Sequence, residues 1–337
     1  MGTTVRRRSP SCWPRLAAPL VAVALAACDG SQSAMDPRGA SAHDLARLSW
    51  ILFIGGAVIF LMVMALVAYA AFGPVDGRRR LGNRKVVVVG GIAFPVVTLS
   101  ALLVYGLLVT DRVAGAGEPA LRIEVVGERW WWRVHYLDED GDISFASANE
   151  VRIPVGRVVE FSLKSNDVIH SFWVPNLGGK LDMIPGHVNT LRLQADEPGT
   201  FRGQCAEYCG GPHALMAFYV VAEPEERFAA WLEQESRPAM APRVPFTRQG
   251  QDLFVRAGCG ACHTVRGTPA DGVIGPDLTH VGSRVSIGAG ILPTNVGTLA
   301  GWIADSQHLK PDNLMPSFNV LQGQDLRAIA AYLESLK

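Results

Sequence analysis

Residues able to bind a soft metal ion are concentrated in the segment QCAEYCGGPHALM. Within it, Cys205 and Cys209 supply two thiolates, His213 an imidazole, Met216 a thioether and Glu207 a carboxylate. Thiolate and thioether sulfur favour copper or iron–sulfur clusters, and imidazole suits copper and zinc. The spacing therefore predicts one compact metal site.

A second imidazole for this site is expected from His170, in the earlier segment VIHSFWVP. Two bridging thiolates, two imidazoles and a weak thioether can hold two copper ions that share one electron with little change of geometry. The residues alone leave two alternatives open. The C-x3-C-x3-H spacing with a distant histidine also fits a Cys2His2 zinc site, and Cys205 and Cys209 form a plausible disulfide in an oxidising compartment.

The segment CGACH has the C-x-x-C-H spacing of a c-type haem attachment site. We expect Cys259 and Cys262 to form the two thioether bonds and His263 to be the proximal iron ligand. A zinc knuckle or a redox-active C-x-x-C pair would have the same spacing. The predicted extracytoplasmic location and the helical surroundings favour haem.

A low-spin haem that carries electrons needs a second strong axial ligand, commonly methionine. Met315, in NLMPSF before the last predicted helix, is the expected ligand. His280 and His308 are weaker alternatives, expected at the surface or beside a haem propionate, and Met240 lies too early in the chain. With GPDLTHVGSR as the middle loop, the segment resembles a class I cytochrome c.

The N-terminus has the layout of a secretory signal peptide: arginines, a short apolar stretch and small residues before Cys28. The sequence LAAC also resembles a bacterial lipobox, which predicts a lipoprotein with Cys28 as the lipidated residue. Ordinary cleavage nearby is the alternative, and Cys12 would leave with the signal.

Two 25-residue segments without charge, 48–72 and 86–110, are each long enough to cross a hydrocarbon core of ~30 Å. The loop between them, GPVDGRRRLGNRK, is strongly basic and is therefore expected in the cytoplasm. This predicts a multi-pass protein of the bacterial plasma (inner) membrane, with everything after Asp111 on the periplasmic side.

The exported part changes character along its length. Short segments rich in Val, Phe, Trp and Thr, separated by turns, predict a β-sandwich. A Pro-rich stretch, RPAMAPRVPF, follows an amphipathic helix, and helical patterns such as GQDLRAIAAYLESLK come after it. The expected division is a signal peptide (1–28), a transmembrane hairpin (45–112), a β domain (118–223), a helix and linker (224–246) and a helical domain (247–337).

Composition limits the function. The 337 residues include 31 basic and 31 acidic ones, so the chain lacks the basic excess of a nucleic-acid binder. The expected contacts are membrane lipid and protein partners.

The segments HSFWVP, LDMIPGHVN, GERWWW and CAEYCGGPHALM, with the two preceding spans, together resemble cytochrome c oxidase subunit II over about residues 45–223. The implied fold is a two-helix transmembrane hairpin, a cupredoxin-like Greek-key β-sandwich and, from the haem motif, a class I cytochrome c domain: a combined membrane, all-β and all-α protein. The resemblance implies a binuclear CuA centre whose ligands are His170, Cys205, Glu207, Cys209, His213 and Met216.

The resemblance assigns two roles to Glu207: its backbone carbonyl binds copper, and its carboxylate binds magnesium at the interface with subunit I. It makes Trp130 the residue at which electrons enter, and it places Lys180 and Asp182 at the contact with subunit I. One position departs from the family. Val88 stands where a glutamate often marks a proton pathway, which puts a proton-uptake role for this chain in doubt.

The implied whole is subunit II of a caa-type haem–copper oxidase, an oxidoreductase and translocase of the respiratory chain. It would take electrons from a donor cytochrome c or a quinol–cytochrome c reductase and pass them through haem c and CuA to haem a of subunit I, with subunit III as a further partner. Oxygen would be reduced to water in subunit I, coupled to proton translocation. The alternatives are a zinc- or disulfide-stabilised assembly subunit, a quinol oxidase subunit II, which lacks the copper ligands, and nitrous oxide reductase, whose propeller has no counterpart here.

Overall fold

The computed structural model describes residue 30 and residues 32–115 and 117–337. The expected signal peptide, with Cys12 and Cys28, lies outside these residues, so its cleavage and lipidation stay predictions.

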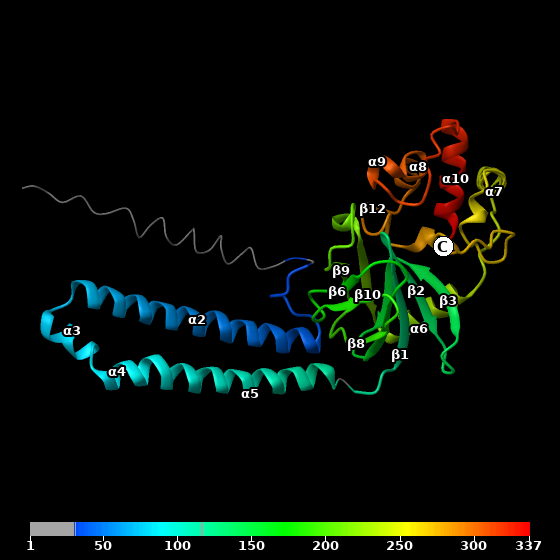
Figure 1. Ribbon diagram of the computed structural model, residues 1–337. Coiled ribbons are helices and arrows are strands. Elements are labelled where there is room, and N and C mark those ends of the chain that lie inside the picture. The colour runs from blue at the N-terminus through cyan, green and yellow to red at the C-terminus, as the bar shows by residue number, and fades with distance from the viewer. Residues whose placement is uncertain (1–29, 31, 116) are drawn as a thin grey trace, which may run out of the picture.

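A helical hairpin projects from one side of the molecule, with its two arms side by side (Figure 1). It consists of α2 (Ala40–Phe72), α3 (Val75–Leu81), α4 (Arg84–Val88), the π-helix η1 (Val89–Ala93) and α5 (Phe94–Ala114). The two candidate membrane spans have mean hydropathies of 2.9 and 2.4, and their most apolar windows bury none of their surface inside the protein. By length and composition, both can cross a membrane.

The first membrane helix begins eight residues before the charge-free segment 48–72, at Ala40 instead of Leu48. Its first turns are not lipid-facing: Ala42 and Ala46 are buried. Just before the helix, a Cβ on Gly39 would lie 2.3 Å from the carbonyl oxygen of Gln194. The helix is therefore extended because its first turns dock on the β domain.

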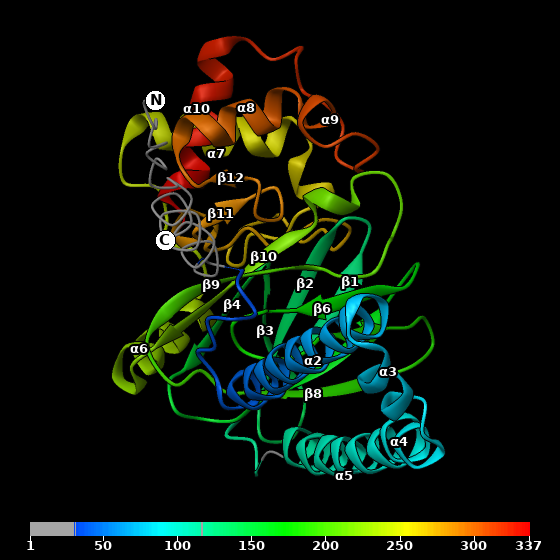
Figure 2. The same cartoon turned by 90° about the vertical axis from the view of Figure 1, so that its left-hand side faces the viewer.

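The β domain is a sandwich of two five-stranded sheets (Figure 2). The strands are β1 (Leu121–Glu128), β2 (Trp131–Leu137), β3 (Ile143–Ala148), β4 (Glu150–Pro154), β5 (Val159–Ser165), β6 (His170–Trp173), β7 (Leu181–Met183), β8 (Asn189–Leu193), β9 (Gly199–Cys205) and β10 (Ala217–Glu223). One sheet has the order β3-β2-β1-β5-β8 and the other β4-β10-β9-β6-β7. The β1–β5 and β4–β10 pairs are parallel and the others antiparallel.

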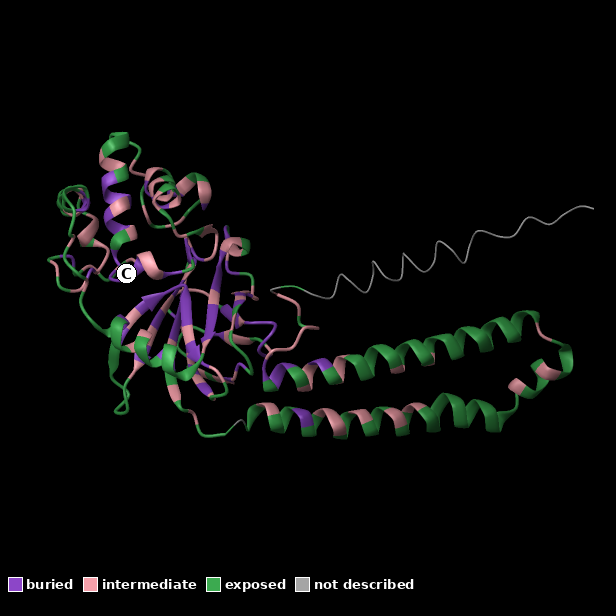
Figure 3. Ribbon diagram, turned by 180° about the vertical axis from the view of Figure 1, so that it is seen from behind, coloured by how far each residue is buried: buried purple, intermediate pink, exposed green. Residues whose placement is uncertain are grey.

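Alternation of side chains along the strands builds the core between the sheets. In β2 and β5 every second residue is buried, as expected for strands with one face inward. Figure 3 shows the buried interior of the sandwich beside the exposed hairpin. At one end of this core the rings of Trp132, Phe172 and Phe218 pack together, with centroids 4.4–5.9 Å apart.

A smaller helical domain lies against the sandwich on the side away from the hairpin (Figures 1 and 2). It contains α7 (Pro245–Arg256), η3 (Cys259–Ala261), η4 (Val281–Ser283), β11 (Ser286–Ile287), β12 (Leu292–Pro293), α8 (Val296–Ala304), α9 (Ser306–Leu309) and α10 (Gly323–Ser335). The helix α6 (Glu225–Ser236) precedes it and packs on the sandwich through Trp231, which contacts Tyr136 and Phe145.

Close approach of α7 and α10 forms the base of the helical domain. A Cβ on Gly250 would lie 2.0 Å from the carbonyl oxygen of Ala328, so only glycine allows this contact. Phe254 and Tyr332 meet edge to face beside it. The predicted membrane hairpin, β-sandwich and C-terminal helical domain are confirmed.

Candidate functional site

The metal-binding side chains predicted from the sequence meet at one end of the sandwich. Cys205 ends β9, His170 begins β6, and Cys209, His213 and Met216 lie in the loop that includes η2 (His213–Leu215) before β10. The two cysteine Sγ atoms are 3.8 Å apart. His170 Nδ1 lies 3.8 Å from Cys205 Sγ, and His213 Nδ1 lies 3.4 Å from Cys209 Sγ. Met216 Sδ is 3.9 Å from Cys209 Sγ.

This donor set fits copper better than the alternatives. Cys205 and Cys209 are free thiols, and their separation of 3.8 Å is far beyond the ~2.05 Å of a disulfide. The donor atoms of His170, Cys205 and Cys209 lie within 4.8 Å of one another and are buried. Structural zinc takes four ligands, whereas two thiolates, two imidazoles and a thioether exceed that number.

The pKa values of the two neighbouring cysteines shift in opposite directions. A hydrogen bond from the Cys209 thiol, helped by His170, lowers the pKa of Cys205 to about 3. The same contact, together with burial, raises the pKa of Cys209. Metal binding requires both sulfurs to be deprotonated, so a bound cation would make both of them thiolates.

Asp167 fixes the orientation of His170. Its Oδ1 lies 2.8 Å from His170 Nε2, so this nitrogen carries the proton and Nδ1 is free to bind metal. A Cβ on Gly127 would lie 2.8 Å from the His170 ring, so this strand position must stay small. Sequence reasoning missed Asp167, although a carboxylate three residues before a ligand histidine is a usable signal.

The C-x-x-C-H segment forms a separate site with the chemistry that haem attachment requires. Cys259 and Cys262 are free and partly exposed. His263 Nδ1 donates to the carbonyl oxygen of Pro276 over 2.8 Å, which leaves Nε2 as a ligand atom. Burial lowers the pKa of His263, which favours the neutral form that a ligand histidine needs. A Cβ on Gly275 would lie 2.6 Å from this ring, so a larger residue at this position would clash with His263.

Met315 is held by its backbone on both sides. Its amide donates to Asn313 Oδ1 over 2.8 Å, and its carbonyl accepts from Ser306 Oγ, also over 2.8 Å. The Met315 side chain packs on the same apolar cluster as Cys259. These residues fit a haem bound between histidine and methionine.

The histidine alternatives fit less well. His280 was expected at the surface or beside a haem propionate; it is buried, which excludes the surface, and its Nε2 is 3.0 Å from the carbonyl oxygen of Arg237 in the linker. His308 is exposed on α9.

Family comparisons match the two parts of the chain that carry these candidate sites. Residues 145–223 match the family described as cytochrome C oxidase subunit II, periplasmic domain, and residues 247–337 match the cytochrome c family. The chain is similar to the cytochrome c oxidase subunit 2 of Alkalihalophilus pseudofirmus, with 36% identity over 93% of this chain and 94% of the relative.

This chain belongs to the cytochrome c oxidase subunit II family.

Two further likenesses accompany this result. The cytochrome c oxidase subunit 2 of Bacillus subtilis is 28% identical over 90% of this chain and 92% of its own length. A crystal structure of the periplasmic domain of the Bradyrhizobium japonicum subunit II covers 35% of this chain and 95% of that chain, with 32% identity and a TM-score of 0.33. Because residues 247–337 match the cytochrome c family, this member of the subunit II family carries its own cytochrome c domain.

The tryptophan triplet of this subunit II divides between the site and the core. Trp130 is buried, and its Nε1 donates to the carbonyl oxygen of Cys209 over 3.1 Å. Trp131 is partly exposed beneath the Arg133 guanidinium. Trp132 belongs to the aromatic core. Of the three tryptophans, Trp130 is therefore the one whose described side chain hydrogen-bonds to the metal-binding loop.

Glu207 presents two different oxygens to two sides. Its backbone carbonyl lies 3.2 Å from Cys205 Sγ, within the metal-binding cluster. Its carboxylate is partly exposed and lies 3.4 Å from Lys180 Nζ, which in turn is 3.9 Å from Asp182. The carbonyl thus lies beside Cys205 and the carboxylate beside Lys180; the expected roles in copper and magnesium binding stay predictions.

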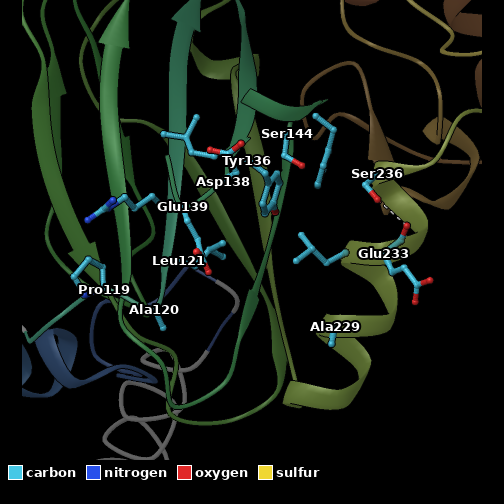
Figure 4. A pocket seen from close by; sticks show the side chains of 14 residues that line it. Pro119, Ala120, Leu121, Tyr136, Asp138, Glu139, Ser144, Ala229, Glu233 and Ser236 are labelled. Carbon is cyan, nitrogen blue, oxygen red and sulfur yellow. Dashed lines mark hydrogen bonds between the residues drawn. The ribbon is translucent and has the colours of Figure 1, made fainter. Parts of the chain in front are cut away.

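A cavity of about 650 Å³ lies away from these sites, between the sandwich and α6. Figure 4 shows side chains that line it, such as Tyr136 from β2 and Glu233 from α6. Its 14 lining residues include no cysteine, histidine or methionine. It therefore offers no redox site.

Proposed function

We propose that this chain is the electron-input subunit of a caa-type oxidase, which carries electrons from a donor through haem c and a binuclear CuA centre to haem a of subunit I. The donor would be a cytochrome c or a quinol–cytochrome c reductase. The hairpin would anchor the chain in the bacterial inner membrane with its basic turn in the cytoplasm, in contact with subunits I and III.

One observation carries the proposal: two cysteine sulfurs lie 3.8 Å apart, and each has its own imidazole beside it. His170 lies beside Cys205, and His213 lies beside Cys209. Such a symmetric pair is expected of two metal ions bridged by two thiolates. A single ion would require the donors to converge on one point.

The remaining donors distinguish the two positions. The carbonyl oxygen of Glu207 is near Cys205, and the thioether of Met216 is near Cys209. When bound, the copper pair supplies a one-electron carrier, and the chain supplies a rigid, buried frame. Preorganised ligands keep the geometry nearly the same in both oxidation states.

Fusion of the cytochrome domain to the copper domain suits this function. A tethered donor acts at a high effective concentration, so that electron input does not depend on a diffusional encounter at this step. Cys259, Cys262, His263 and Met315 would hold the haem.

Two features depend on subunit I. The outward carboxylate of Glu207 would bind magnesium at that interface, where subunit I completes the ligand set. Oxygen reduction and proton translocation would occur in subunit I, and Val88 leaves this chain without the carboxylate that the family often places there.

Copper analysis tests the proposal. The full-length chain with haem attached is reconstituted with copper, quantified and examined by electron paramagnetic resonance. Two copper ions that share one unpaired electron are expected beside a low-spin haem. Cys205→Ser should abolish this copper signal. Glu207→Gln is the matched control, because the carbonyl and not the carboxylate faces the metal site, and it should keep the signal.

A single copper ion, or zinc without a copper signal, would contradict the proposal. The chain would then be a haem-bearing structural subunit. Loss of the copper signal in Glu207→Gln would show that the divided role of this residue is wrong.

A further inference from the structure

Lys310 is a buried lysine at the junction of the cytochrome and copper domains. It follows α9 in the cytochrome domain, and only 2% of its surface is exposed. Its ammonium group crosses to the copper domain and donates to the carbonyl oxygens of Trp130 and Leu215, the latter over 2.9 Å. A third bond of 3.2 Å goes to the carbonyl of Gly288 in its own domain.

Burial of this charge is costly and requires compensation. Burial lowers the pKa of Lys310 to about 7, and no carboxylate of the described residues pairs with its ammonium group. An ammonium group has three donors and no acceptor, and here it meets three carbonyl oxygens. Separation of the domains would leave Trp130 and Leu215 without this donor, so the arrangement favours one docked position.

The two carbonyl acceptors on the copper domain belong to the metal-binding region. Leu215 immediately precedes Met216, and Trp130 bonds through its indole to Cys209. Ala217, which follows Met216, also contacts the cytochrome domain. Its amide donates to the carbonyl oxygen of Ala289 over 3.0 Å.

The contact leaves no space for larger residues. A Cβ on Gly290 would lie 2.8 Å from the Ala217 Cβ, and Gly290 also has a positive φ of 80°. A Cβ on Gly211 would lie 3.3 Å from a carboxylate oxygen of Asp312. The segments 288–290 and 310–312 of the cytochrome domain therefore fit closely onto the loop that holds the metal ligands.

A second group of contacts holds the domains together farther from the metal. The amide of Val285 donates to Glu150 Oε2 over 2.6 Å, and Arg152 donates to the carbonyl oxygen of Ser283 over 3.2 Å. Arg133 donates to the carbonyl oxygen of Val273 over 2.9 Å. These bonds resist rotation about the Lys310 contact.

We propose that Lys310 is a positioning residue that locks the cytochrome domain in one docked position over the Trp130 face of the copper domain. The domain is then a fixed part of the structure and not a mobile carrier on its linker. The consequence for electron input rests on the proposed function; the docking itself does not.

This position also determines where an external donor binds. Trp130, where electrons are expected to enter, is buried, and its backbone carbonyl contacts the chain's own cytochrome domain through Lys310. A soluble electron-carrying protein must therefore dock on the cytochrome domain.

Amine labelling of the full-length holoprotein tests the docking directly. The chain has five lysines, of which Lys164, Lys180 and Lys337 have half-exposed side chains and serve as internal references. With an acetylating reagent under native conditions, Lys310 should react at least ~50-fold more slowly than Lys337, because labelling requires the domains to open. Labelling of Lys310 within about threefold of Lys337 would overturn the proposal.

Hydrogen exchange in variants tests the role of the lysine itself. The amides of Ala217 and Val285 bond across the junction and therefore report on its opening. Lys310→Met should accelerate their exchange by ~10-fold or more, while the haem and copper spectra stay unchanged. Lys310→Arg should restore part of the protection, and the surface control Lys337→Met should have no effect. Exchange at the wild-type rate in Lys310→Met would contradict the positioning role. If this variant does not fold, the amine labelling of the wild-type chain still tests the docked position.

The labelling is independent of the copper assignment. A chain that binds no binuclear copper but protects Lys310 would refute the proposed function and leave the docking intact. A chain with the expected copper signal and a reactive Lys310 would support the proposed function and refute the docking.

Discussion

The indole Nε1 of Trp130 donates a hydrogen bond to the carbonyl oxygen of Cys209, 3.1 Å away. This bond joins the aromatic residue that faces the cytochrome domain to a cysteine of the metal-binding cluster. The carbonyl of Trp130 accepts from Lys310. One residue thus contacts both domains, through its side chain on one side and its backbone on the other.

Trp130→Phe tests the side-chain contact. The variant keeps an aromatic ring but leaves the buried carbonyl of Cys209 without its donor, which should lower the free energy of unfolding by about 1–3 kcal/mol. We expect the copper-loaded variant to unfold at a lower urea concentration, with unfolding monitored through the copper absorption. Trp131→Phe is the control, because the indole of Trp131 donates no hydrogen bond among the described residues. An equal loss of stability in Trp131→Phe would contradict the interpretation.

Asp167→Ala tests the orientation of His170. Without the carboxylate at His170 Nε2, the ring loses its fixed tautomer, and copper affinity should fall ~10–100-fold. Competition with a copper chelator measures this affinity. Asp140→Ala, in an exposed turn, should leave affinity unchanged. Unaltered affinity in Asp167→Ala would show that burial alone orients the histidine.

Met315→Ala tests the separation of the two sites. Removal of the thioether should convert the haem from low-spin to high-spin and lower electron input, because the iron loses its second strong ligand. Copper content and the copper signal should stay as in the wild type. Met240→Ala, in the exposed linker, is the control. Loss of the copper signal in Met315→Ala would contradict the two-site picture.

The environment of Glu124 leads us to expect that this carboxyl group contributes to the loss of fold stability in acid. Burial alone would raise its pKa, but hydrogen bonds from Lys164 and His135 outweigh burial, so the pKa is lowered from its usual 4.5. A carboxyl group with a lowered folded-state pKa stabilises the fold above its unfolded pKa, and this contribution is lost as pH falls through the folded pKa.

Glu124→Gln should therefore lower stability near neutral pH and flatten its decline below about pH 4.5. Tryptophan fluorescence of the full-length chain during acid titration measures both effects. Glu139→Gln, in the exposed turn after β2, should titrate as the wild type does. An unchanged acid limb in Glu124→Gln would mean that this carboxyl group is not stabilised in the folded protein.

Local spacing was sufficient to predict the metal-binding donors. Cys205, Cys209, His213 and Met216 lie in one loop, so any compact fold of that loop brings them together. His170 lies on a distant strand and was added by the need for a second imidazole and by family resemblance. The structure places it beside Cys205.

Features that depend on distant contacts were not predicted. Lys310 reads as an ordinary surface lysine in LKPDN, because nothing local shows that the copper domain will cover it. The parallel β1–β5 pair could not be predicted from a turn, because these two strands are not joined by a hairpin. The early start of α2 at Ala40 depends on a surface of the β domain that the hydropathy of the helix does not reveal.

The central claim is that electrons pass within one chain from the cytochrome domain to the copper site. The most direct measurement is rapid photoreduction of the haem in the full-length, copper-loaded chain, with absorption followed at the haem and copper bands over a range of protein concentrations. We predict that the reduced-haem signal decays in a first-order step whose rate is independent of concentration and that the copper signal changes at the same rate. A haem signal that persists, or a rate that rises in proportion to protein concentration, would contradict the account.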